Sequence, residues 1–158
     1  MKKVIEIKNL VKKYGKFHAV DDISFEVQEG EIFGFLGPNG AGKSTTIRCL
    51  MGFNKPSSGE TLILGDNLFS QSDGSKNKVG YLPGNVKLND NWTGWEHIHF
   101  FESVRGKSDN LNELIQKLDF HPEAKFRHLS SGNKQKLGLI LALMNSPKVI
   151  IVGEATVG

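Results

Sequence analysis

The sequence predicts an α/β fold in a single domain, and three observations support this. Apolar and polar residues alternate over Val4–Leu10 and again over Ile23–Val27, which is typical of half-buried strands and indicates an antiparallel part near the start. The short apolar run Ile32–Leu36 is typical of a buried strand, and a glycine-rich loop and a helical segment follow it. A second apolar run, Val149–Val152, follows a helical pattern over about residues 132–144.

The segments between these runs fit the same alternation. Thr93-Gly94-Trp95-Glu96 matches a capping box, so a helix is expected to begin at this point. Turn and periodicity signals indicate further strands over about 60–64 and 78–82, and a helix over about 111–118. We therefore expect a core sheet, an N-terminal antiparallel part and a short helical subdomain over about residues 85–135, all within the one domain 1–158.

Composition excludes several classes of function. The chain has 158 residues, of which 38% are hydrophobic and 23% charged, as in globular domains. A formal net charge of +3 is too mild to indicate a nucleic-acid partner, and no stretch approaches the ~18 apolar residues of a membrane span. The single cysteine, Cys49, excludes an internal disulfide and fits a reducing cytoplasm. Any link to a membrane is therefore expected to run through a partner.

The strongest chemical signal is a glycine-rich loop that matches the P-loop pattern at every specified position. In such a loop, glycines let successive backbone N–H groups surround phosphate oxygens, and the following helix adds its positive end. The lysine places a charge on the β- and γ-phosphates, and the serine hydroxyl is offered to Mg²⁺. The alternative is a glycine-rich turn between core elements. The residues predicted to contact phosphate are Gly37, Pro38, Asn39, Gly40, Ala41, Gly42, Lys43, Ser44 and Thr45.

The loop and the segments around it resemble the ATP-binding subunits of ABC transporters. Gly-Pro-Asn-Gly-Ala-Gly-Lys-Ser-Thr-Thr looks like the ABC form of the motif, and five segments follow the family's order. The resembling segments are Tyr14-Gly15 (the A-loop), Ala19–Phe25 with Val20, Val79–Pro83 (the strand before the Q-loop), Leu129–Asn133 (the LSGGQ signature) and Val149–Glu154 (the Walker B strand). The resemblance covers essentially the whole chain, and within the family it is greatest to subunits that energise drug, peptide or antibiotic exporters.

This resemblance implies a mechanism and a set of partners. Two such domains would meet head to tail, with ATP and Mg²⁺ held between the P-loop of one and the signature of the other. Tyr14 would stack on adenine, Val20 would lie with the nucleotide-contacting residues, and Ser130 and Gly132 would touch the γ-phosphate across the interface. Glu154 would orient the attacking water. The subunit would be cytoplasmic, on the inner face of the membrane, bound to a permease through residues 84–95. An exposed hairpin tyrosine is the alternative for Tyr14.

The departures from the family pattern leave enzymatic activity open. Gly153 stands where the family has the Walker B aspartate, and Gly84 stands at the Q-loop position. The sequence ends at Gly158, before the D-loop, a further strand and the switch histidine of the family. That strand would lie between the P-loop and Walker B strands, so the isolated chain is expected to be poorly stable or to self-associate. We expect it to bind ATP but to hydrolyse it poorly.

Two other functions stay open at this point. One is a non-catalytic fragment or degenerate copy that at best binds nucleotide. The other is a soluble ABC protein of translation or DNA maintenance, although paired domains, long inserted arms and basic tracts are not visible. A metal site at His97 and His99 is not expected, because residues two apart on a helix point in different directions.

Overall fold

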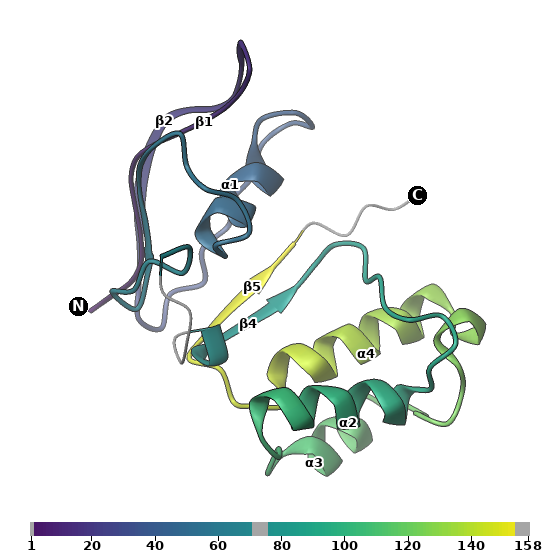
Figure 1. Ribbon diagram of the computed structural model, residues 1–158. Helices are drawn as coiled ribbons and strands as arrows, with labels where there is room; N and C mark the ends of the chain where they lie inside the picture. The colour runs from purple at the N-terminus through teal and green to yellow at the C-terminus, as the bar shows by residue number, and fades with distance from the viewer. Residues whose placement is uncertain (1, 71–75, 154–158) are drawn as a thin grey trace. The chain divides into compact units, whose positions relative to one another are not determined.

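The computed structural model describes residues 2–70 and 76–153 and divides into two compact units, residues 1–76 and 77–158. Figure 1 shows the helices and strands of both. Among the described residues, no helix is long and apolar enough to cross a membrane. Each unit is taken by itself below.

The first unit is an antiparallel sheet with one helix packed against it. Strands β1 (Lys3–Tyr14), β2 (Phe17–Gln28) and β3 (Ser58–Ile63) pair in the order β2-β1-β3. Helix α1 spans Lys43–Leu50 and is labelled with β1 and β2 in Figure 1. The predicted N-terminal antiparallel part is thus confirmed, with longer strands than expected. Cys49 of α1 is fully buried, and this burial raises the pKa of its thiol.

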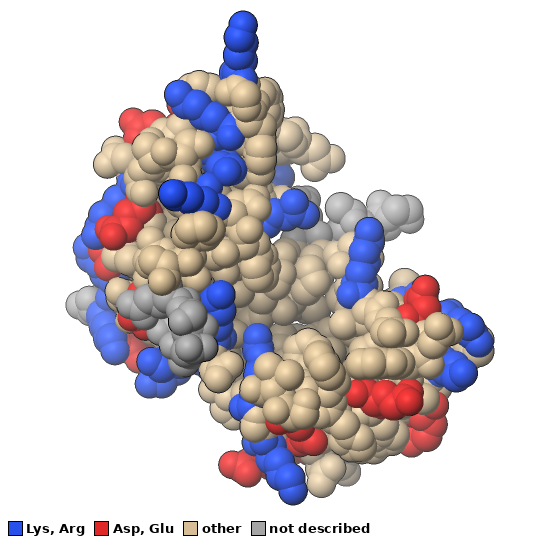
Figure 2. Space-filling view, in the orientation of Figure 1, with Lys and Arg blue, Asp and Glu red and all other residues tan. Residues whose placement is uncertain are grey.

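Ion pairs link the central strand of this sheet to both of its neighbours. Lys3 pairs with Glu26 at 2.6 Å, and Lys8 pairs with Glu60 at 3.6 Å, so each ion pair joins two neighbouring strands. In Figure 2 the lysine, arginine and acidic side chains of the first unit are interspersed. These pairs are exposed to solvent, so each adds little to the stability of the sheet.

The strand predicted at Ile32–Leu36 is not formed. Residues 31–38 have no regular secondary structure, and neither sheet of the described chain includes them. Ile32 is 100% exposed and Leu36 is 90% exposed, although the apolar run had indicated a buried strand. The physical reason is that a strand requires the backbone of a neighbour, and no described strand pairs with this segment.

The second unit combines a short parallel sheet with four helical segments. Strands β4 (Val79–Leu82) and β5 (Val149–Val152) pair in parallel, with Val79 opposite Val149 and Leu82 opposite Val152. The α-helices are α2 (Gly94–Arg105), α3 (Leu111–Lys117) and α4 (Ser131–Leu143), and η2 is a 3-10 turn at Phe126–His128. A further 3-10 turn, η1 (Lys76–Lys78), spans the division between the units. Helix α4 packs against β4.

The capping box predicted at the start of α2 is present. The Thr93 hydroxyl accepts from the backbone N–H of Glu96, and the Glu96 carboxylate accepts from the backbone N–H of Thr93 at 2.7 Å. The hydrogen bonds from Thr93 lower the pKa of the Glu96 carboxyl. The start of α2 and both ends of α3 and α4 agree with the predicted helices within one residue.

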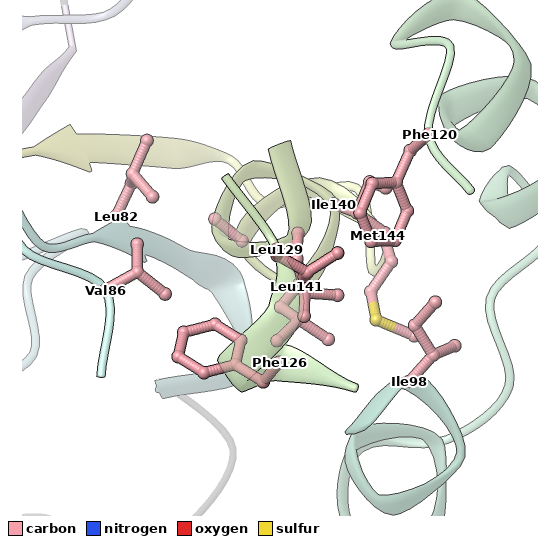
Figure 3. Close-up of a cluster of buried hydrophobic side chains, with 11 residues drawn as sticks. Leu82, Val86, Ile98, Phe120, Phe126, Leu129, Ile140, Leu141 and Met144 are labelled. Carbon is pink, nitrogen blue, oxygen red and sulfur yellow. The ribbon is translucent and has the colours of Figure 1, made fainter. Parts of the chain in front are cut away.

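The core of the second unit lies between α4, β4 and α2. Figure 3 shows how its side chains converge. Ile98, Leu137 and Ile140 are fully buried, and Trp95 packs against the cluster as a partly buried residue. The cluster consists of Leu82, Val86, Ile98, Phe120, Phe126, Leu129, Leu137, Ile140, Leu141, Ala142 and Met144.

Close contact between β4 and α4 predicts a steric effect at Gly80. A Cβ at this position would lie 2.5 Å from the carbonyl oxygen of Ala142. This oxygen belongs to the backbone of α4, so it cannot move without shifting the helix. We expect Gly80→Ala to destabilise the second unit by about 1–3 kcal/mol, as overpacking does. Urea unfolding followed by the fluorescence of Trp92 and Trp95 measures this.

Gly132→Ala is the matched control, because a Cβ on Gly132 meets only the Ser130 hydroxyl at 4.0 Å. Gly132→Ala should leave the urea concentration at the unfolding midpoint unchanged or raise it, since alanine favours a helix more than glycine does. Equal midpoints for Gly80→Ala and the unmodified chain would contradict the steric argument.

Candidate nucleotide-binding site

The glycine-rich loop opens helix α1 in the first unit. Gly40 and Gly42 both have φ of 85°, in the left-handed region that glycine adopts without strain. Gly42 is the N-cap of α1, and a Cβ there would lie 2.2 Å from the carbonyl oxygen of Ala19. Only glycine therefore fits at position 42, and the loop is held close to the start of β2.

Lys43 and Ser44 occupy the first turn of this helix. The Lys43 ammonium donates to the carbonyl oxygens of Gly37 at 2.5 Å and Pro38 at 3.0 Å, so it lies across the loop from which it extends. Ser44 is exposed, and the first turn of α1 contains no acidic residue. Backbone N–H groups, the positive helix end and one ammonium thus meet at the loop, an arrangement suited to binding phosphate.

Val20 of β2 contacts the loop, and Tyr14 lies at the end of the paired strand β1. The Cβ position of Gly42 is 3.2 Å from the Cγ2 atom of Val20, so Val20 packs against the loop. Val20 is opposite Lys12 in the β1–β2 ladder, and Tyr14 follows two residues along the strand, opposite Phe17. Tyr14 is 50% exposed. The structure thus brings three of the predicted contact groups, the loop, Val20 and Tyr14, into one unit.

The predicted signature residues lie at the start of α4 in the second unit. Ser130 is the N-cap of this helix, and its hydroxyl accepts from the backbone N–H of Asn133 at 3.2 Å. Ser130 and Gly132 are exposed. A helix N-terminus with exposed backbone groups is a second place where an anion is favoured.

The sequence matches a known protein family over most of its length. The model of the family described as ABC transporter matches residues 20–157, which include parts of both units. The chain belongs to the ABC transporter family. It is 40% identical over 162 residues to the probable multidrug ABC transporter ATP-binding protein YbhF of Escherichia coli (strain K12), which covers 98% of this chain and 28% of YbhF.

Two further matches agree with this assignment. The chain is 39% identical over 163 residues to the uncharacterized ABC transporter ATP-binding protein YhcH of Bacillus subtilis (strain 168), over 100% of this chain and 53% of YhcH. A solved ATP-binding subunit of an ABC transporter has a TM-score of 0.85 at 28% identity, over 98% of this chain and 67% of that one. The chain thus spans 28% and 53% of these two curated relatives. Its fold is that of an ABC ATPase domain, a P-loop NTPase.

The positions at which this ABC chain departs from the family pattern lie next to each other. Gly84 follows β4 and Gly153 follows β5, at the carboxyl ends of paired parallel strands. The backbone N–H of Gly153 donates to the carbonyl oxygen of Leu82 at 2.7 Å, and a Cβ on Gly153 would lie 2.7 Å from the backbone nitrogen of Gly84. Neither glycine supplies a side-chain oxygen or amide.

Sequence reasoning missed a residue that holds this region. The Gln135 side chain of α4 donates to the carbonyl oxygen of Gly84 at 2.9 Å, across 51 residues of sequence. Nothing local in the sequence indicates such a contact.

Side chains suited to a metal are sparse in the described ranges 2–70 and 76–153, which contain no group of three His, Cys, Asp or Glu residues placed to hold an ion. The Ser44 hydroxyl is one suitable oxygen, and Mg²⁺ commonly binds through few protein groups together with substrate phosphates. Mg²⁺ therefore fits here only as a companion of bound phosphate. Glu154, the predicted catalytic residue, lies outside the described residues.

Proposed function

We propose that this chain is the ATP-binding component of an ABC transporter, and that the loop from Gly37 to Ser44 binds the phosphates of ATP. The observation that carries the proposal is the geometry of this loop: two left-handed glycines, a helix start and the Lys43 ammonium converge on one place. Calorimetric titration with ATP tests it, and a chain that shows no saturable binding would refute it.

We further propose how the rest of the nucleotide is held. Tyr14 stacks on adenine and Val20 lies beside the bound nucleotide, which the half-exposed tyrosine ring and the contact between Val20 and Gly42 support. Ser44 contributes an oxygen to the Mg²⁺ that accompanies the phosphates.

Assembly follows from the positions of the anion-binding groups. We propose that two copies of the domain meet head to tail, with Ser130 and the backbone N–H of Gly132 reaching the γ-phosphate held by the loop of the other copy. Their exposure at the start of α4 supports this role. A membrane-spanning permease would bind residues 84–95 and keep the subunit at the cytoplasmic face of the membrane.

A second candidate function is nucleotide binding without appreciable hydrolysis. The specific observation that favours it is the pair Gly84 and Gly153, because the ends of β4 and β5 carry two glycines where the family has an amide or acid and an aspartate. Phosphoryl transfer depends on positioning and charge stabilisation, so loss of these groups would slow it steeply. Measurement of phosphate release separates the two candidates.

A further inference from the structure

The tyrosine proposed to stack on adenine is held by a residue outside the recognised motifs. The Asn54 side-chain amide donates to the Tyr14 hydroxyl at 2.9 Å, across 40 residues of sequence. A hydrogen bond at the end of the ring restricts rotation about the side-chain bonds of a half-exposed tyrosine. The ring is therefore held in one orientation before any ligand arrives.

A cation covers one face of the same ring. The Lys12 ammonium lies 5.0 Å from the centroid of the Tyr14 ring, within the range of a cation–π interaction. This ammonium also donates to the carbonyl oxygen of Lys55 at 2.8 Å, which fixes its position. A base that stacks on Tyr14 must then use the opposite face.

The end of helix α1 positions Asn54. The backbone N–H groups of Phe53 and Asn54 both donate to the carbonyl oxygen of Arg48, at 2.9 and 3.1 Å. Gly52, with φ of 71°, makes the turn that permits these bonds, and a Cβ there would lie 2.5 Å from the carbonyl oxygen of Leu68. The residue that holds Tyr14 thus lies four positions after the end of the helix that starts at the phosphate loop.

We propose that Asn54 is a positioning residue for base recognition: it acts through Tyr14, and it does not contact phosphate. The inference rests on the proposed stacking of adenine on Tyr14 and extends it. The geometry assigns the orientation of the stacking ring to the Asn54 amide. The Lys12 ammonium covers one face of that ring and so leaves the other face open to the base. Asn54 therefore contributes to affinity for the base and leaves affinity for phosphate unchanged.

Paired titrations with ATP and inorganic tripolyphosphate test the inference, because the second ligand has phosphates and no base. Tyr14→Ala is expected to weaken the binding of ATP about 5- to 150-fold, the range for loss of a base–aromatic stack. Asn54→Ala is expected to weaken the binding of ATP about 2- to 10-fold, as loss of one hydrogen bond does. Both variants should bind tripolyphosphate like the unmodified chain, which also shows that they are folded.

Two further variants isolate the hydrogen bond itself. Asn54→Asp should retain ATP affinity, because a carboxylate accepts a hydrogen bond from the phenol. Tyr14→Phe removes the hydroxyl, so adding Asn54→Ala to Tyr14→Phe should cause no additional loss of ATP affinity.

The outcomes separate the inference from the proposed function beneath it. If Tyr14→Ala leaves ATP binding unchanged, the stacking role of Tyr14 fails. If Tyr14→Ala weakens ATP but Asn54→Ala does not, only the inference fails. The inference would also be overturned if Asn54→Ala lost affinity equally for ATP and tripolyphosphate. It would likewise fail if Asn54→Asp bound ATP as weakly as Asn54→Ala does.

Discussion

The purified chain supplied with Mg²⁺ and ATP is expected to release phosphate at least about 10²–10³ times more slowly than the ordinary enzyme rate of ~10 s⁻¹. Gly153 and Gly84 replace groups that support Mg²⁺ and sense the γ-phosphate in the family's pattern, and loss of one preorganised contact has an effect of this size. The two losses need not multiply, because the groups belong to one catalytic unit.

Restoring the acid at position 153 is not expected to rescue hydrolysis. A Cβ on Gly153 would lie 2.7 Å from the backbone nitrogen of Gly84, so Gly153→Asp must displace the segment that follows β4. Phosphate release by the unmodified chain, Gly153→Asp and a Glu154→Gln control would be compared. Turnover near ~10 s⁻¹ in the unmodified chain, abolished by Glu154→Gln, would show that the two glycines are compatible with catalysis.

Lys43→Ala is expected to weaken ATP binding about 10- to 150-fold, which corresponds to roughly 1.5–3 kcal/mol for hydrogen bonds to a charged group. Lys43 is the one cationic side chain within the sequence Gly37–Ser44, and its ammonium already lies over the loop carbonyls. Calorimetric titration of both forms with ATP gives the two dissociation constants.

Lys87→Ala provides the matched control for this change. Lys87 is an exposed lysine outside the loop sequence, so its removal alters the net charge by the same amount without changing the loop. ATP affinity should be unchanged in Lys87→Ala. Equal affinities of the unmodified chain and Lys43→Ala would remove the proposed role of the loop.

Local signals in the sequence predicted local features of the structure well. The capping box at Thr93 and Glu96 involves residues three apart, and the phosphate loop is one continuous segment, so both could be recognised without knowledge of the fold. Strand β5 was predicted with its observed bounds, Val149–Val152, because a short apolar run between a helix and a loop has few alternatives. Its predicted burial was wrong for alternate residues, since Ile150 is 50% and Val152 is 59% exposed among the described residues.

Features that depend on distant partners could not be predicted in this way. The buried strand predicted at Ile32–Leu36 was wrong, because an apolar run does not supply the neighbouring strand that a sheet requires. The bonds from Asn54 to Tyr14 and from Gln135 to Gly84 join residues 40 and 51 positions apart, and a single sequence carries no record of such pairs. The predicted roles of Tyr14, Ser130 and Gly132 therefore stay predictions until they are measured.

The exposed segment Ile32–Leu36 also bears on how the chain avoids amyloid-like aggregation. It combines β-branched and aromatic residues without charge or proline, the composition from which cross-β stacking begins. Its flanks carry the residues that oppose such stacking: Glu29 and Glu31 lie on one side, and Pro38 lies on the other. Between these gatekeepers lie six residues, the lower length of a typical steric-zipper segment, and two of the six, Gly34 and Gly37, are glycines, which such segments rarely contain. Pro38 thus belongs to the phosphate loop and at the same time closes the aggregation-prone window.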